Sequence, residues 1–247
     1  MGYGLYLYGI FPYPGPRNLE LVGLDQQPVQ AHRIDSFTFL YSEAQQERYL
    51  ASRRNLLGHE RVLEQAMESG YRTLLPLRFG LIIEDWTAVE AQLIIPHAAG
   101  LKTLLERLNG QREVGIKVYW ETATELESLM AEHEDLRAER DRLMGKSLSM
   151  EQVIQIGQAI DEAMGDRKQA VIKTFQDALN PLAAEVVEND PLTDTMIYNA
   201  AYLIPWDDEP AFGDRVEELD QTFDDRLRIR YNNFTAPFNF AQLDTLN

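Results

Sequence analysis

Residues 226–231 (RLRIRY) alternate basic and apolar side chains, and this alternation restricts the segment to a strand with two unlike faces. Successive side chains of a strand point to opposite sides, so Leu227, Ile229 and Tyr231 share one face and three arginines share the other. The apolar face has to be buried. The segment is therefore predicted to close a β-sheet.

The strand leads into an aromatic tail, which carries Phe234, Phe238 and Phe240 around Pro237. Terminal segments usually stay disordered unless other residues hold them. Two interpretations follow: the rings are a staple that fastens the tail to its own domain, or they are a docking site for a partner. Core aromatic residues outnumber functional ones, which favours the staple.

Length and composition indicate a folded globular protein. The chain has 247 residues, enough for two domains of ordinary size, and 45% of them are hydrophobic. No apolar run approaches the roughly 20 residues that span a bilayer, and the first residues lack the positive charge of a signal peptide. We therefore expect a cytoplasmic protein. The absence of cysteine excludes disulfides, thiolate catalysis and cysteine-bound metals.

The net charge of −17 lies almost wholly in the second half of the chain. Residues 1–110 carry 12 acidic and 10 basic side chains, whereas residues 111–247 carry 28 acidic and 13 basic ones. Such an excess repels nucleic acids and anionic membranes, because both are bound mainly through their phosphates. We expect neither as a partner. The acidic residues either keep helices soluble, which is the commoner case, or form a face for a basic partner.

The first half, residues 1–110, is predicted to form the smaller α+β domain, with a mixed sheet and helices. Its first strand is apolar on both faces, which is typical of a central strand. Pro76 and Gly80 interrupt the third strand, which indicates an edge or a bulge. The predicted elements are strands at 3–10, 33–41 and 73–83, and helices at 43–68 and 86–108.

The second half, residues 111–233, is predicted to be a ferredoxin-like α+β domain with a long helical hairpin. Counted as one crossover, the hairpin completes the βαββαβ order, in which helices pack on one face of an antiparallel sheet. The tail occupies residues 234–247. The predicted elements are a strand at 113–120, the hairpin at 123–144 and 149–179, strands at 184–188 and 195–204, a helix at 209–223 and the strand at 226–231.

No pattern in the sequence predicts catalysis. The sequence has no phosphate-binding loop, no dinucleotide-binding glycine motif and no nucleophile elbow. Its four histidines, His32, His59, His97 and His133, lack the i, i+4 spacing of helical metal sites. We expect His133 to pack within the helical hairpin and the other three to lie at the surface or an interface. Catalytic, cofactor-binding and metal-binding residues are therefore predicted to be absent.

Two acidic clusters and one arginine remain as candidates for a special role. Residues 207–209 and 224–225 group carboxylates, as cation sites do, but the first cluster precedes a predicted helix, where acidic side chains stabilise the helix dipole. The second is expected to be solvated. Arg78 lies between Leu77 and Phe79 in an apolar strand, so its charge has to reach solvent or a partner. A structural ion pair is the simpler explanation of Arg78.

Six segments along the chain resemble the gas vesicle GvpF/GvpL family, and most closely its cyanobacterial F-type members. They are residues 4–10 (GLYLYGI), 75–80 (LPLRFG), 108–114 (LNGQREV), 117–120 (KVYW), 227–231 (LRIRY) and 237–240 (PFNF). Their order and joint presence carry the match. The resemblance implies a minor, non-enzymatic gas vesicle component, which associates with the hydrophobic shell protein GvpA in the cytoplasm and assists vesicle assembly.

The resemblance also gives the aromatic residues a candidate role in partner contact. A shell subunit apolar enough to exclude water would aggregate if left free, so a soluble partner that covers it would be useful. The candidate contacts are Arg78, Phe79, Tyr231, Phe234, Phe238 and Phe240. The alternative is a small-ligand-binding regulatory module or enzyme on a ferredoxin-like fold, which requires a pocket with converging polar groups.

Overall fold

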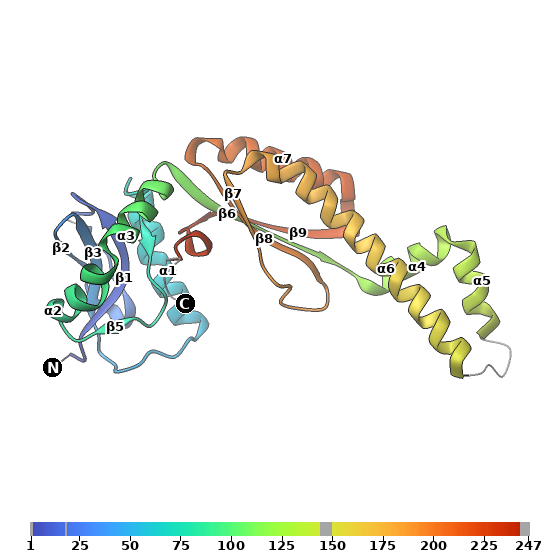
Figure 1. The fold of residues 1–247 in the computed structure, drawn as a ribbon, viewed down its shortest axis with the longest axis horizontal. Coiled ribbons are helices and arrows are strands. Elements are labelled where there is room, and N and C mark those ends of the chain that lie inside the picture. The colour runs from blue at the N-terminus through green and yellow to red at the C-terminus, as the bar shows by residue number, and fades with distance from the viewer. Residues whose placement is uncertain (1, 18, 144–149, 243–247) are drawn as a thin grey trace. The chain divides into compact units, whose positions relative to one another are not determined.

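Two β-sheets and the helices that pack on them make up this mixed α+β protein (Figure 1). The computed structural model describes residues 2–17, 19–143 and 150–242. Its residues divide into two units, each assembled from segments that are distant in the sequence. Unit 1 groups the described residues of Met1–Val114, Tyr202–Glu209 and Asn232–Asn247, and unit 2 groups those of Gly115–Ala201 and Pro210–Tyr231.

Sheet 1 belongs to unit 1 and has the strand order β2-β3-β1-β4, with β5 also pairing with β1. All of these pairs are antiparallel, and β1 is central, as its apolar pattern predicts. A register shift between Leu7 and Gly9 marks a bulge in β1. The strands are β1 (Leu5–Pro12), β2 (Gln30–Ile34), β3 (Phe37–Glu43), β4 (Leu75–Pro76) and β5 (Ile82–Ile83).

Three predicted elements of this half are shorter or divided in the structure. The strand predicted at 33–41 is two strands, because the chain reverses at Asp35, which has a positive φ of 52°. The helix predicted from residue 43 begins only at Arg53, where Ser52 caps it by accepting a hydrogen bond from the N–H of Asn55. The strand predicted at 73–83 is β4 and β5 with a loop between them.

Side chains from both faces of sheet 1 are buried, because successive residues of its strands point in opposite directions. Helix α1 (Arg53–Glu68) buries Val62 and Leu63 in one cluster with Tyr6 and Tyr8 of β1. Phe39 of β3 points to the other face and contacts Trp86. Sheet 1 is therefore the middle layer of unit 1.

The helix predicted at 86–108 is interrupted by a π-helical turn. It consists of α2 (Trp86–Val89), the π-turn Glu90–Ile94 and α3 (Ile95–Leu108). Pro96 stands in the first turn of α3, and a proline inside a helix removes one backbone donor and crowds the preceding turn. A local change of hydrogen-bonding pattern accommodates it.

Sheet 2 has the strand order β7-β8-β6-β9. Its strands are β6 (Gln111–Trp120), β7 (Glu185–Glu188), β8 (Met196–Pro205) and β9 (Leu227–Thr235), and β6, β8 and β9 have residues in both units. Helices α6 (Met150–Leu179) and α7 (Glu209–Phe223) lie on one face of this sheet (Figure 1). The order of strands and helices is the one that the sequence predicts for residues 111–233.

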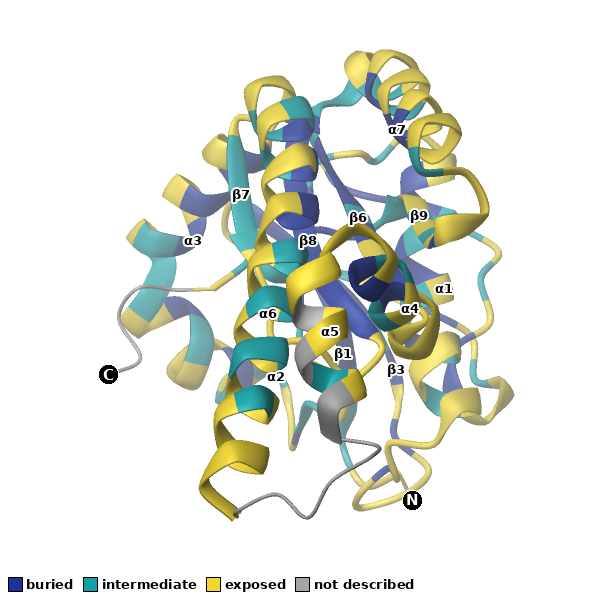
Figure 2. Cartoon of the chain, turned by 90° about the vertical axis from the view of Figure 1, so that its right-hand side faces the viewer, coloured by how far each residue is buried: buried dark blue, intermediate teal, exposed yellow. Residues whose placement is uncertain are grey.

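Aromatic contacts in unit 2 join the helices to sheet 2. Phe175 of α6 contacts Tyr198 of β8, and Phe212 of α7 stacks on Tyr231 of β9. Strand β8 is buried along nearly its whole length, whereas much of α6 is exposed (Figure 2). The buried surface of unit 2 is therefore concentrated where α6 and α7 meet the strands.

The first helix of the predicted hairpin is broken at His133. The chain forms α4 (Thr122–Glu132) and α5 (Glu134–Leu143), and His133 between them has a φ of −110° and a ψ of 86°. His133 is exposed, so the prediction that it packs within the hairpin is wrong. Acidic residues follow the break directly and stabilise the positive end of α5. The predicted helix start at Ser149 lies outside the described residues.

A buried glutamate joins α4, α6 and the turn that precedes β9 within unit 2. Glu125 is 1% exposed and accepts hydrogen bonds from Arg226 at 2.6 and 2.9 Å and from Arg167 at 2.7 Å. Arg167 also binds Glu132, at 2.7 Å. Burial on its own raises the pKa of the Glu125 carboxyl, but the hydrogen bonds from Arg226 and Arg167 outweigh it and hold the pKa below its usual value.

Replacement of Glu125 by alanine should destabilise unit 2. Glu125→Ala leaves two guanidinium groups without their shared carboxylate, and we expect the free energy of unfolding to fall by about 2 kcal/mol, a figure reduced for the partial exposure of Arg226. The loss should shrink as the pH falls, because protonation of Glu125 removes the same charge. Urea unfolding at neutral and acidic pH measures both effects.

Glu127→Ala is the matched control, since Glu127 is an exposed glutamate of the same helix. Equal urea midpoints for the two variants at neutral pH would show that the Glu125 ion pairs contribute nothing to stability.

Candidate functional site

A loop of residues 77–81 connects β4 to β5, and two buried side chains hold it. The N–H of Gly80 donates to the hydroxyl of Tyr6 at 3.1 Å, and that hydroxyl donates to Nδ1 of His59 at 3.0 Å. On the other side of the ring, Nε2 of His59 donates to the carbonyl of Leu77 at 3.0 Å. A carbonyl can only accept, so Nε2 carries the proton and Nδ1 accepts from Tyr6. The loop is therefore clamped at both ends.

Burial of His59 and Tyr6 determines which of their atoms donate and which accept in these hydrogen bonds. Burial lowers the pKa of His59 to about 4, although the hydrogen bond to Leu77 opposes the shift, so the imidazole is neutral at pH 7. Burial also raises the pKa of the Tyr6 phenol above its ordinary value, which keeps the proton that Tyr6 donates. Gly80 has a φ of 85°, a conformation that glycine adopts without strain.

His59 is 1% exposed, so the prediction that it lies at the surface or an interface is wrong. Its position in the sequence indicates burial, because it lies three residues before Val62 and four before Leu63, on the buried stripe of α1. Burial of its ring is possible because Tyr6 and Leu77 satisfy both ring nitrogens.

The clamped loop presents Arg78 and Phe79, two of the predicted contact residues. Arg78 is exposed and forms no hydrogen bond or ion pair with any described residue, so the predicted structural ion pair is not found. Phe79 is half-buried and meets the rings of His59 and Tyr6 edge-on, with centroids 5.9 and 6.3 Å apart. A fixed loop thus carries a cation beside a partly exposed aromatic ring.

Three side chains anchor the aromatic tail to unit 1. Glu113 of β6 accepts from the backbone N–H of Asn239 at 2.9 Å and from its side-chain amide at 2.7 Å. Arg107 donates to the carbonyl of Phe240, and Arg112 donates to the carbonyl of Asn233. The tail is therefore bound through its backbone at several points.

The rings of the tail pack inside unit 1 as well. Phe240 is 2% exposed, and Phe238 meets the His59 ring with centroids 6.1 Å apart. Phe234 contacts Trp206 edge-on at 6.0 Å, and Arg112 lies over the Trp206 ring at 4.8 Å. These contacts fasten the tail to its own unit.

Four rings from distant parts of the sequence meet at one place, which we call the His59 cluster: Tyr6, His59, Phe79 and Phe238. Of the six predicted contact residues, Phe79 and Phe238 belong to this cluster, and Arg78 neighbours it in the loop. Tyr231 lies in unit 2, half-buried against Phe212. The structure therefore gathers part of the predicted set in the His59 cluster.

Glu113, which the sequence did not single out, is a buried carboxyl of unit 1 with a shifted pKa. It is 4% exposed, and burial raises the pKa of its carboxyl to about 7, although the hydrogen bonds from Asn239 oppose the shift. Near neutral pH the group that holds the tail is therefore close to half protonated. No local pattern marks it, because its partner lies 126 residues away.

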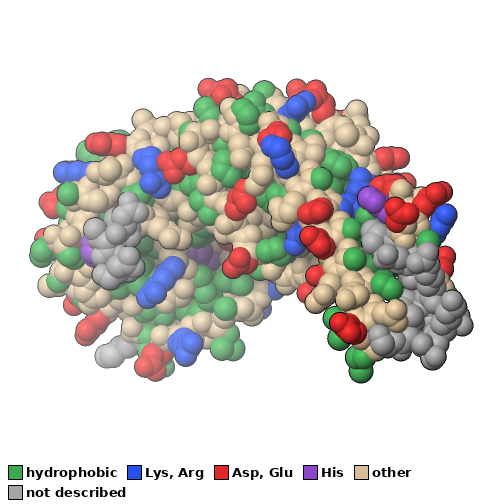
Figure 3. Space-filling view, turned by 45° about the vertical axis from the view of Figure 1, so that its right-hand side comes forward, with side chains coloured by type: hydrophobic (Ala, Val, Ile, Leu, Met, Phe, Trp, Pro, Cys, Tyr) green, Lys and Arg blue, Asp and Glu red, His purple; other side chains and the backbone are tan. Residues whose placement is uncertain are grey.

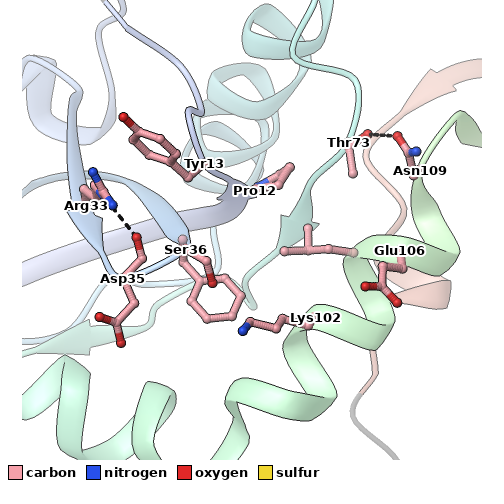
Figure 4. Close-up of a pocket in the computed structure, with 11 residues that line it drawn as sticks. Pro12, Tyr13, Arg33, Asp35, Ser36, Thr73, Lys102, Glu106 and Asn109 are labelled. Atoms are coloured by element: carbon pink, nitrogen blue, oxygen red, sulfur yellow. Dashed lines mark hydrogen bonds between the residues drawn. The ribbon is translucent and has the colours of Figure 1, made fainter.

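A cavity of about 760 Å³ opens beside α3 in unit 1 (Figure 4). Phe37 and Leu105 provide apolar lining, and Arg33 lies over the Tyr13 ring at 3.9 Å while it donates to the carbonyl of Asp35 at 2.9 Å. The six predicted contact residues and the perturbed groups Tyr6, His59 and Glu113 are not among its lining residues. The cavity is thus separate from the His59 cluster.

The described part of the chain offers no metal site and no membrane span. Within residues 2–17, 19–143 and 150–242, no group of three histidine or carboxylate side chains is placed to hold a metal ion. None of the helices in those ranges combines the length and apolarity needed to cross a bilayer.

The structure is thus a mixed α+β fold with two sheets, and the loop of residues 77–81 carries a cation and an aromatic ring on its surface. The chain belongs to the family described as gas vesicle synthesis protein GvpL/GvpF, which matches residues 4–242. It is 59% identical to gas vesicle protein F of Dolichospermum flosaquae, over 99% of this chain and 100% of that protein.

Two crystal structures of cyanobacterial GvpF proteins resemble this structure. GvpF from Anabaena sp. PCC7120 superposes with a TM-score of 0.90 at 57% identity, covering 97% of this chain and 98% of the other. GvpF from Microcystis aeruginosa superposes with a TM-score of 0.86 at 57% identity, covering 98% and 100%. The protein is thus a gas vesicle protein that resembles the cyanobacterial F-type members over nearly its whole length.

Acidification should destabilise the protein through His59. The unfolded chain takes up a proton at His59 below about pH 6.5, whereas the folded chain does so only below about pH 4, so lower pH favours unfolding across that window. The shift corresponds to about 3 kcal/mol at its full extent. Urea titrations of wild type and His59→Gln between about pH 7 and pH 4 should show a smaller fall in the variant.

His133→Gln, at an exposed histidine, is the control for the loss of one imidazole. Parallel pH profiles for wild type and His59→Gln would contradict the buried neutral histidine.

The buried carboxyl of Glu113 should make the free energy of unfolding depend on pH in the opposite sense. Its carboxyl is protonated in the folded state below about pH 7 and in the unfolded state only below about 4.5, so lower pH within that window favours folding. Asn239→Asp places a second carboxyl against Glu113. We expect a loss of about 2 kcal/mol near pH 8 and a smaller loss near pH 5, where the pair holds a proton.

Thermal unfolding and limited proteolysis of the tail measure this effect. Asn232→Asp is the control, because Asn232 is an exposed asparagine of β9, outside the turn Phe238–Phe240 that Glu113 binds. A loss in Asn239→Asp that does not change with pH would exclude Glu113 as its cause.

Proposed function

We propose that this protein is a minor, non-enzymatic gas vesicle component that assists assembly by associating with the hydrophobic shell protein GvpA and preventing its aggregation. Membership of the gas vesicle family supports the gas vesicle role. The observation that supports contact with GvpA is the clamped loop. In this loop Arg78 is exposed and has no partner among the described residues, and Phe79 is half-buried. The proposed location is the cytoplasm, in association with gas vesicles.

A rigid loop suits recognition of a subunit that has not yet been assembled. A loop whose backbone is held in one conformation loses little entropy on binding, so more of the contact energy appears as affinity. The chain Gly80–Tyr6–His59–Leu77 supplies this rigidity. Aromatic residues and arginine are also the residues that most often dominate protein interfaces.

We propose two roles for the other predicted contact residues: direct contact with the partner, and attachment of the tail. Phe234, Phe238 and Tyr231 are half-buried and keep part of each ring exposed for a partner. Phe240 is buried, so its proposed part is to fix the tail, not to touch the partner directly.

We also propose that residues 111–233 form a ferredoxin-like domain, that residues 1–110 form a separate α+β domain, and that residues 234–247 are a tail. The strand order β7-β8-β6-β9 supports the first part, since the first and third strands of the βαββαβ order, β6 and β8, are the two central ones. Two hydrogen bonds hold the proposed tail: the N–H of Asn239 donates to Glu113, and Arg107 donates to the carbonyl of Phe240.

The 760 Å³ cavity is the observation that favours the alternative, a small-ligand-binding module or enzyme. Its size lies in the usual range of ligand pockets, about 300–1,000 Å³. Its lining does not include the groups with the most perturbed pKa values, which are the usual mark of a functional pocket. The assembly role therefore has the better support.

Reversal of the loop charge should weaken binding of the shell protein without unfolding the chain. Arg78→Glu removes an exposed cation, so we expect the unfolding free energy to change by less than about 0.5 kcal/mol and capture of GvpA to fall about tenfold. Pull-down with purified GvpA, together with fractionation of intact vesicles, measures the contact.

Arg53→Glu, at an exposed arginine of α1, is the control for the same change of charge. Capture by Arg78→Glu at the level of Arg53→Glu would remove the loop from the interface.

A further inference from the structure

Three cationic side chains gather around one tyrosine on sheet 2. The guanidinium groups of Arg228 and Arg230 in β9 lie 4.6 and 5.3 Å from the centre of the Tyr119 ring in β6, the neighbouring strand. Lys117 lies two residues before Tyr119 and so on the same face of β6. All three cations are exposed, and all four residues belong to unit 2. We call them the Tyr119 patch.

The Tyr119 patch lies on the face of the strands opposite the helices. Tyr231 of β9 stacks on Phe212 of α7, and Arg230 is the residue before it, so its side chain points the other way. The same alternation places Tyr119, which is itself only 9% exposed, on the face opposite Val118 and Trp120. This face therefore carries cations where the other face carries the core of unit 2.

The cations of the patch have no carboxylate partner, unlike other arginines of this unit. Lys117, Arg228 and Arg230 form no hydrogen bond or ion pair with any described residue. Arginines that lie within ion-pair distance of a carboxylate are Arg137, Arg140, Arg167, Arg215 and Arg226. Acidic side chains are spread along α7 and the α4–α6 region (Figure 3). The patch is thus a cationic site without a counter-charge on a surface that is acidic elsewhere.

Stacking on Tyr119 prepares the two arginines for an anion. A guanidinium over an aromatic ring is held through its face, which leaves the N–H groups at its edge available. These N–H groups form a fork that matches the two oxygens of a carboxylate. The ring therefore orients Arg228 and Arg230 but does not satisfy their donors.

Strand β9 also ends the sheet on this side. It follows β6 in the order β7-β8-β6-β9, so no strand in the described part of the chain pairs with its outer edge. An open edge is a template for a further strand. An extended segment beside β9 would place alternate side chains about 5 Å from Arg228 and Arg230, the usual cross-strand distance.

We propose that β9 binds an extended acidic segment of a partner protein, which adds a strand to sheet 2 and pairs carboxylates at alternate positions with Arg228 and Arg230. Lys117 lies on the same face and attracts the flanking acidic residues. A long nucleic acid fits less well, because three cations neutralise few phosphates and the chain as a whole carries −17. The Tyr119 patch shares no residue with the clamped loop or the tail.

A fluorescent peptide tests the proposal on the full chain. The probe has the length of β9, 9 residues, and alternates Glu with Val and Thr. Fluorescence anisotropy should show saturable binding that weakens with salt. Binding should fall about tenfold or more for Arg228→Glu/Arg230→Glu and stay at the wild-type level for Lys173→Glu/Arg215→Glu, which changes the charge equally on exposed helix positions.

A second peptide separates strand addition from simple charge attraction. N-methylation of alternate residues keeps every carboxylate but removes backbone donors, so this peptide should bind about tenfold more weakly than the first. Circular dichroism of both double variants confirms that they are folded.

Five results would overturn the proposal. Three concern the peptide: an absence of binding, equal binding of the methylated and unmethylated peptides, and equal binding by the two double variants. The other two point to a different occupant: an oligothymidylate that binds more tightly than the peptide, and self-association of the chain that Arg228→Glu/Arg230→Glu abolishes.

Discussion

The hydrogen bond from Tyr6 to His59 is the contact on which unit 1 depends most. It joins the central strand of sheet 1 to the helix that covers it, and the same two side chains hold the loop between β4 and β5. Phe79 of that loop and Phe238 of the tail pack on the same imidazole ring. A neutral, fully hydrogen-bonded histidine can occupy this position because it satisfies a polar loop while it offers an aromatic surface. The candidate surface for a partner is thus built outward from a buried polar pair.

The charges of the protein fall into two groups, according to whether they have a partner. Glu125 is buried between Arg167 and Arg226, and Glu113 is buried against the tail amide, so both carboxylates serve the fold. Arg78 and the cations of the Tyr119 patch are exposed and make no ion pair with a described residue. Arg226 and Arg228 are two residues apart yet belong to different groups. The two surfaces proposed for binding use cations of this second group, which no carboxylate of a described residue neutralises.

Regular, strongly patterned segments of the fold could be predicted from the sequence. The helix at 209–223 begins and ends in the structure where the pattern places it. The strand predicted at 226–231 begins one residue later, at Leu227, and forms the first part of β9. Both depend on local periodicity. The divided strands and helices were not predicted, because neither the turn at Asp35 nor the break at His133 is marked by a glycine or proline in the sequence.

The residues of the candidate site also divide into those that a local sequence pattern reveals and those that it does not. Arg78 and Phe79 stand out in the sequence because a charge interrupts an apolar run. His59 and Glu113 do not, since each is defined by partners that only the fold supplies: Tyr6, which lies 53 residues away, and Asn239, which lies 126 residues away. A histidine on the buried stripe of a helix was the one local clue to the first.

The discontinuous composition of unit 1 has a consequence for biosynthesis. A polypeptide leaves the ribosome from its N-terminus, so sheet 1 and α1 are made first and wait while residues 115–201 are synthesised. Glu113 then lacks Asn239, and His59 lacks Phe238, until almost the whole chain has been translated. Unit 1 therefore gains its C-terminal segment only after synthesis has advanced the 126 residues from Glu113 to Asn239, and the surface that this segment covers is open until then.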